Sequence, residues 1–186
     1  YEDALYKELY EFTSYLLNTY KGTGKVFYLG NWEGDWHLRS DYDRTKPVNP
    51  KTLEGMIRWG KIRQKAIDDA KRDNKYQNVS VYHYIEVNLV RKALQQPDSK
   101  VVANSILNVV NPDFVSYSSY DATNPYKTEK DINLNLQKSL DFLESQLSPK
   151  PNLPAGKRVW IGEYGNPSIN HNDDSQNIRS IWTIKS

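Results

Sequence analysis

The sequence predicts an α/β fold in which parallel strands are joined by crossover helices. Short apolar runs alternate along the chain with longer segments whose apolar residues recur at helical spacing. The apolar runs begin near residues 25, 79, 113 and 157, about 44 residues apart on average. The chain has 14 Tyr, 5 Trp and 4 Phe, and these large side chains can fill the core of one domain of 186 residues.

The first half of the chain predicts a helix, a strand and a second helix. The opening helix covers residues 1–20, where the apolar stripe is formed by Leu5, Leu9, Phe12 and Leu16. Residues 26–30 form an apolar run that is too short for a helix and rich in strand formers. Asn49 followed by Pro50 is typical of a helix start, because asparagine caps the first turn and proline suits its first position. The helix is expected to continue to about residue 73.

The second half predicts three further strands, at residues 79–85, 114–118 and 158–162. Pro97 interrupts the segment between the first two of them, and apolar residues at positions 102, 106 and 109 favour a helix after it. The segment from Thr128 to Asp131 resembles a capping box, which predicts a helix with apolar residues at positions 132, 136, 140, 143 and 147. A last helix is expected over residues 177–184.

Charge and composition argue against several classes of function. The 25 basic and 23 acidic side chains are interspersed and leave a net charge of +2, so no basic stripe follows a nucleic-acid backbone. No stretch approaches the roughly 18 apolar residues of a membrane helix. The chain has no Cys, and its acidic segment at residues 41–43 lacks the pattern of a calcium loop. We therefore expect one soluble domain over residues 1–186, with no metal or other cofactor and no nucleic-acid or membrane partner.

Polar and aromatic side chains follow every predicted strand. Because ligands bind at the carboxyl ends of parallel strands, these side chains are expected to converge on one rim. The candidates are Asn31, Trp32, Glu33 and Trp36 after the first strand, His83, Glu86 and Asn88 in or after the second, Tyr120 after the third, and Glu163 and Tyr164 at the fourth. Two glutamates from different strands, flanked by aromatic rings, provide what cleavage of a glycosidic bond requires: a proton donor, an anion and apolar platforms for sugar faces.

Two of these segments carry a resemblance to a known family. Gly30-Asn31-Trp32-Glu33 and Ile161-Gly162-Glu163-Tyr164-Gly165 resemble the fourth-strand and seventh-strand ends of the retaining glycoside hydrolases with (β/α)8 barrels, of the cellulase, β-galactosidase and β-mannanase type. The resemblance implies that Glu33 is the general acid/base and Glu163 the nucleophile, with Tyr120 beside the nucleophile. It also implies an oligosaccharide or polysaccharide substrate and favours a secreted or extracytoplasmic location.

The same resemblance implies a partial barrel. Two strands lie between the two glutamates, as they do between the fourth and seventh strands of the family, so the chain corresponds to about four of the eight strand–helix units. Four strands cannot close a barrel. The remaining strands would come from a longer chain or from a second copy.

Several residues and the function itself keep an alternative interpretation. Trp32 separates Asn31 from Glu33, whereas the family has asparagine and glutamate adjacent, which supports a non-catalytic carbohydrate-binding or scaffold domain as the second hypothesis. Asp35 is a substitute for the acid, and the two tryptophans either bind sugar or anchor the loop. His83 is either a core residue or a substrate contact, and Glu86 is either structural or a substrate ligand. A doubly wound domain with a reversal of strand order is the third hypothesis.

Overall fold

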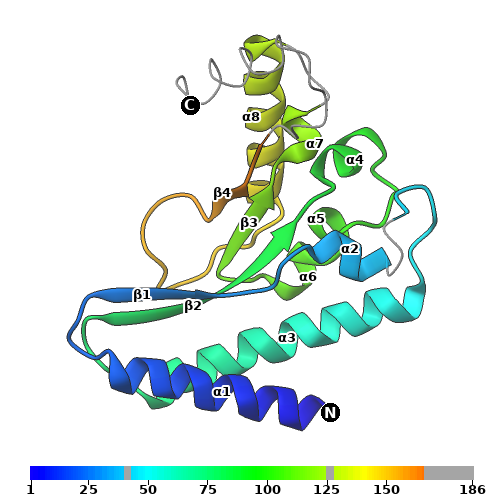
Figure 1. Ribbon diagram of the computed structural model, residues 1–186. Coiled ribbons are helices and arrows are strands. Elements are labelled where there is room, and N and C mark those ends of the chain that lie inside the picture. The colour runs from blue at the N-terminus through cyan, green and yellow to red at the C-terminus, as the bar shows by residue number, and fades with distance from the viewer. Residues whose placement is uncertain (40–42, 125–127, 166–186) are drawn as a thin grey trace.

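The computed structural model describes residues 1–39, 43–124 and 128–165 (Figure 1). The strands are β1 (Lys25–Leu29), β2 (Val79–Val87), β3 (Phe114–Ser118) and β4 (Val159–Glu163). The helices are α1 (Glu2–Thr19), α2 (Gly34–Arg39), α3 (Pro50–Asp73), α4 (Val90–Gln95), α5 (Val102–Ser105), α6 (Leu107–Val110), α7 (Tyr120–Thr123) and α8 (Glu129–Ser145). No helix in these ranges is long and apolar enough to cross a membrane.

The four described strands form one parallel sheet in the order β1-β2-β3-β4. The sheet curls into half of a barrel, which confirms the alternating α/β layout expected from the sequence. Each strand pairs with its neighbour in the chain, so the strand order does not reverse anywhere in this sheet. A doubly wound domain requires such a reversal. The third hypothesis from the sequence is therefore wrong for the described strands.

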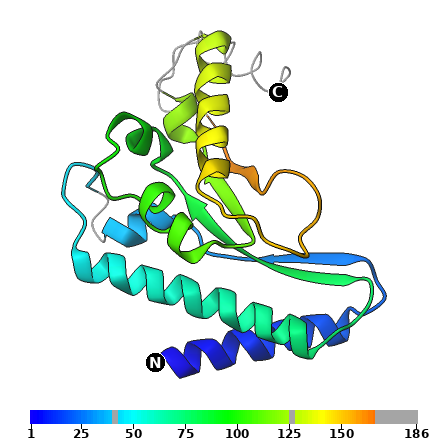
Figure 2. The same cartoon turned by 180° about the vertical axis from the view of Figure 1, so that it is seen from behind.

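Two long helices run side by side across the outer face of β1 and β2 (Figures 1 and 2). These are α1 and α3, and α3 begins where the sequence indicates, with the Asn49 side chain accepting a hydrogen bond from the Lys51 N–H at 2.9 Å. The buried face of α1 consists of Leu9, Thr13, Leu16 and Leu17. Phe12, which the sequence assigns to this face, is 47% exposed, because it projects to the edge of the stripe that the other four residues define.

The hydrophobic core lies between the outer face of the sheet and its helices. Outward-facing Ile85 and Val87 of β2 and Val115 and Tyr117 of β3 pack in one cluster with residues of α4, α5, α6 and α8. A second cluster joins the N-terminal end of β2 to α1 and α3. Since successive strand residues point to opposite faces, the residues between them, including Glu86, Ser116 and Ser118, point to the concave side.

The concave face of the sheet carries a cluster of aromatic rings. Tyr28, Tyr82, Phe114, Tyr84 and Trp160 come from all four strands, and the Tyr28 ring centroid lies 5.1 Å from that of Trp160 and 5.3 Å from that of Phe114. Tyr28 is nevertheless 44% exposed. In a closed barrel, side chains at such positions fill the interior.

Short helices account for most of the differences from the sequence prediction. The predicted helix after Pro97 is present as α5 and α6, with a break at Ile106, while α2, α4 and α7 were not predicted. Each of these three unpredicted helices has only four to six residues, which is too few to display an apolar stripe. The helix expected over residues 177–184 lies outside the described residues.

Candidate functional site

Glu163 ends β4 with both carboxylate oxygens held by side chains from the region of β3. The Ser118 hydroxyl donates to Oε2 at 2.9 Å, and the Tyr120 hydroxyl donates to Oε1 at 2.9 Å. Hydrogen bonds to a carboxylate are stronger than those between neutral groups. The two donors fix the position of Glu163 at the carboxyl end of the sheet.

A local irregularity between β3 and β4 brings Glu163 into this position. The register shifts between Tyr117 and Ser118, so that Ser118 lies opposite Glu163. Gly162 lies at this shift, and a Cβ atom added to it would lie 1.9 Å from the Ser116 hydroxyl oxygen. The close approach of the two strands therefore requires glycine at position 162.

Glu86, at the end of β2, is a second carboxylate at the rim and is only 6% exposed. Its Oε1 accepts hydrogen bonds from the Glu33 N–H at 3.0 Å and from the Asn88 side chain at 3.4 Å. Burial raises the pKa of Glu86, the bond from the Glu33 N–H opposes this rise, and the nearby charge of Glu163 adds to it. Glu86 thus forms a hydrogen bond with the segment that follows β1, and its carboxylate is repelled by that of Glu163 at the end of β4.

Glu33 lies in the short segment between β1 and α2. Its backbone has a φ of 51°, and its carbonyl oxygen accepts hydrogen bonds from the N–H groups of Trp36 and His37, which opens the first turn of α2. Side chains other than glycine, asparagine and aspartate rarely adopt this left-handed conformation. The next residue, Gly34, is packed so closely that an added Cβ would lie 2.3 Å from the carbonyl oxygen of Glu86. The segment that carries Glu33 is therefore pinned against β2.

Tyr120 contacts Glu163 and is within range of the charges of Glu33 and Glu86. Burial is the largest cause of the raised pKa of its hydroxyl, and the hydrogen bond to Glu163 is the next. The negative charges of Glu163, Glu33 and Glu86 also raise this pKa. All three carboxylates therefore lie near one partly exposed tyrosine, which is 36% exposed.

Asp35 is structural in this arrangement. It is completely buried and accepts hydrogen bonds from the backbone N–H groups of Asn88 at 2.8 Å, Leu89 at 3.1 Å and Val102 at 2.8 Å. Burial raises the pKa of Asp35, and these three hydrogen bonds lower it. The carboxylate joins α2 to the segments after β2 and before α5, and it has no exposed surface with which to act as a substitute acid.

The remaining side chains from β1 and β2 play different parts. The Asn31 side chain accepts a hydrogen bond from the Glu86 N–H at 3.3 Å, and Asn88, which is 8% exposed, accepts one from the Asp35 N–H at 3.2 Å. His83 is fully buried, with Nδ1 3.1 Å from the Gln64 side-chain oxygen. Burial lowers the pKa of His83 to about 3. His83 points toward the helices, so the substrate contact that the sequence allowed is not available to it.

The aromatic candidates divide into exposed and packed residues. Trp32 is 65% exposed and Tyr164 is 62% exposed, and they flank Glu33 and Glu163 in the sequence. Trp36 instead packs against the core, with the Arg44 guanidinium 5.4 Å from its ring centroid. Its loop-anchoring interpretation is therefore the better one, while the exposed rings of Trp32 and Tyr164 are available to a ligand.

Sequence reasoning missed Ser118, which holds Glu163. A serine at the end of an apolar strand gives no signal unless the register between the strands is known.

The described residues contain no group of three or more His, Asp or Glu side chains that could hold a metal ion. Comparison of the chain with protein families, with curated proteins and with solved structures finds no match.

Proposed function

We propose that this chain is a glycoside hydrolase domain that cleaves a glycosidic bond with retention of configuration. Glu163 is the nucleophile, and Glu33 is the general acid/base. The observation that supports this most is the placement of Glu163 between Ser118 and Tyr120, with Glu33 and Glu86 near the same tyrosine. Retaining cleavage requires a pair of carboxyl groups that face one sugar ring.

In the first step, an oxygen of Glu163 attacks the anomeric carbon and forms a glycosyl ester. The bond from that carbon to the leaving oxygen breaks, and Glu33 transfers its proton to this oxygen. In the second step, Glu33 removes a proton from water, which attacks the anomeric carbon and releases Glu163. Tyr120 and Ser118 orient the carboxylate for attack, because each holds one of its oxygens.

Glu86 acts as a positioning residue in this mechanism. Its carboxylate accepts the Glu33 N–H at 3.0 Å, and the segment it holds carries a strained backbone at Glu33. The raised pKa of Glu86 also makes it the competing candidate for the proton donor. Substrates with good and poor leaving groups separate the two roles, because only a poor leaving group needs a proton in the first step.

For this test, Glu33→Gln and Glu86→Gln are assayed on a dinitrophenyl glycoside and on the matching methyl glycoside. We expect Glu33→Gln to lose activity on the methyl glycoside far more than on the dinitrophenyl glycoside. Glu86→Gln should lower activity on both by a similar factor. The reverse pattern would assign the proton donor to Glu86.

Glu163→Gln tests the proposed function directly. We expect it to abolish turnover of dinitrophenyl glycosides while the circular dichroism spectrum and melting temperature stay close to those of the parent chain. Glu54→Gln, at an exposed position of α3, is the matched control and should retain full activity. Turnover that survives Glu163→Gln would remove this residue from the mechanism.

A non-catalytic carbohydrate-binding domain is the second candidate. The exposed rings of Trp32 and Tyr164 favour it, because aromatic platforms bind sugar faces without any bond cleavage. Saturable sugar binding that is weakened by Trp32→Ala, together with no turnover on any aryl glycoside, would establish this function in place of hydrolysis.

A further inference from the structure

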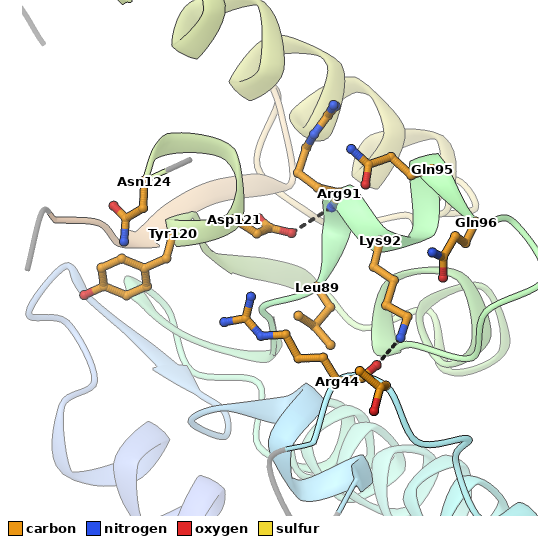
Figure 3. A pocket seen from close by; sticks show the side chains of 10 residues that line it. Arg44, Leu89, Arg91, Lys92, Gln95, Gln96, Tyr120, Asp121 and Asn124 are labelled. Carbon is orange, nitrogen blue, oxygen red and sulfur yellow. Dashed lines mark hydrogen bonds between the residues drawn. The ribbon is translucent and has the colours of Figure 1, made fainter. Parts of the chain in front are cut away.

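A second concave region adjoins the proposed catalytic carboxylates. It is a cavity of about 700 Å³ between α4, α7 and the segment around Arg44, and Tyr120 lies on its wall (Figure 3). Tyr120 also donates a hydrogen bond to Glu163. Tyr120 is therefore shared by the wall of the cavity and the proposed catalytic rim, and the volume of the cavity is within the range of small-ligand sites.

Positive charge predominates around this cavity. Arg44, Arg91 and Lys92 line it, and Asp121 is the only carboxylate among the lining residues that the structure describes. Figure 3 shows the Arg44 side chain extending past Leu89 in the direction of Tyr120. Within the ranges that the structure describes, no carboxylate forms a salt bridge with any of the three cations.

The one carboxylate has other partners. Asp121 Oδ2 accepts a hydrogen bond from the Arg91 backbone N–H at 2.7 Å, and Oδ1 accepts one from the Tyr117 hydroxyl. The Lys92 ammonium group donates to the Arg44 carbonyl oxygen, which is neutral. Burial is the largest cause of the lowered pKa of Lys92, the charge of Arg39 adds to it, and the charges of Asp35 and Asp43 oppose it. An anionic ligand would balance the excess of cationic side chains among the described lining residues.

We propose that this cavity is a subsite for a sugar unit that carries an anionic group, either a carboxylate or a sulfate, on the substrate chain cleaved at Glu163. This inference rests on the proposed function, since Tyr120 both lines the cavity and holds Glu163. Arginine and lysine recognise carboxylates and sulfates through charge-assisted hydrogen bonds. The side chains of Gln95, Gln96 and Asn124 also line the cavity and offer donors and acceptors for sugar hydroxyls.

The test compares matched acidic and neutral ligands by calorimetry on the chain with Glu163→Gln, which prevents cleavage. One pair is trigalacturonate and its carboxyl-reduced galactose trisaccharide, and the other is cellotriose with one sulfate and cellotriose itself. We expect at least one acidic ligand to bind about tenfold more tightly than its neutral counterpart. The pair that shows this preference identifies the anionic group as carboxylate or sulfate.

Charge variants assign the preference to the cavity. Arg44→Gln and Lys92→Gln should each reduce the preference for the acidic ligand about three- to tenfold, whereas Lys61→Gln, on the exposed face of α3, should leave it unchanged. Equal binding of acidic and neutral ligands, or a preference that both cavity variants retain, would overturn the subsite.

The two proposals can fail independently. Neutral aryl glycosides that are cleaved in a Glu163-dependent manner, without any preference for acidic ligands, would refute only the subsite. A preference that depends on Arg44 and Lys92, in a chain that cleaves no glycoside, would refute the hydrolase and leave the cavity as a binding site for an acidic sugar.

Discussion

Asp121 makes the stability of this domain depend on pH in a way that one substitution should remove. Burial raises its pKa from 3.8 to about 6, partly opposed by the hydrogen bonds from Tyr117 and the Arg91 N–H. The folded protein therefore holds this proton more tightly than the unfolded chain does. The contribution of protonated Asp121 to the free energy of unfolding is fully present below about pH 4 and is lost as the pH rises to about 6. At about 1.4 kcal/mol per pH unit, the loss is about 3 kcal/mol.

Asp121→Asn keeps the shape of the side chain without the charge. Its amide oxygen can accept from the Arg91 N–H, and its amino group can donate to the Tyr117 hydroxyl. Urea unfolding at pH 4 should give similar stabilities for the variant and the parent chain. At pH 7.5 the variant should be more stable by up to about 3 kcal/mol.

The control for this experiment is Asp98→Asn, at an exposed position before α5. The difference in unfolding free energy between this control and the parent chain should not change between pH 4 and pH 7.5. An Asp121→Asn variant that is less stable than the parent at pH 7.5, or whose stability difference from the parent is independent of pH, would refute the reasoning.

Three further predictions concern Tyr120, Glu33 and His83. Tyr120→Phe removes one donor to Glu163 and should lower kcat/KM about 10- to 100-fold with little change in melting temperature. An unchanged kcat/KM together with a lower melting temperature would argue against a role of Tyr120 in orienting Glu163. Glu33→Gly relieves a left-handed backbone worth about 1–2 kcal/mol, offset by about 0.4–1 kcal/mol of chain entropy, so urea unfolding should show equal or higher stability alongside lost activity. A Glu33→Gly variant with a clearly lower free energy of unfolding than the parent chain would contradict the strain assigned to Glu33. His83 should remain neutral from pH 5 to pH 8 in an NMR titration, and a midpoint near 6.5 would mean that its ring is not buried.

Much of the fold could be predicted because its strands and long helices each leave a local pattern. The Asn49-Pro50 start of α3 and the Thr128 start of α8 are determined by first-turn hydrogen bonds, and both caps form as the sequence indicates. The short helices α2, α4 and α7 could not be predicted, because they are fixed by tertiary contacts. In α2, for example, the segment is held by Asp35, whose hydrogen-bond partners lie 53 to 67 residues away.

The rim was predictable only to the level of strand ends. Their positions at the ends of apolar runs place Glu86 and Glu163 at the carboxyl edge, and both are found there. The sequence also places His83 within a strand, but it does not show that the outer face of β2 is covered by α3, from which Gln64 binds the imidazole. The role of Ser118 depends on a register shift that leaves no trace in a single sequence.

Labelling of the nucleophile tests the central proposal most directly. The chain is incubated with dinitrophenyl 2-deoxy-2-fluoroglycosides of several sugars, which trap the glycosyl ester of a retaining enzyme, and the product is digested for peptide mass mapping. The proposal predicts one added glycosyl unit on Glu163 with at least one of these sugars, and no label on the Glu163→Gln variant. A label on a different carboxylate, or no label with any sugar, would contradict the assignment of Glu163 as the nucleophile of a retaining hydrolase.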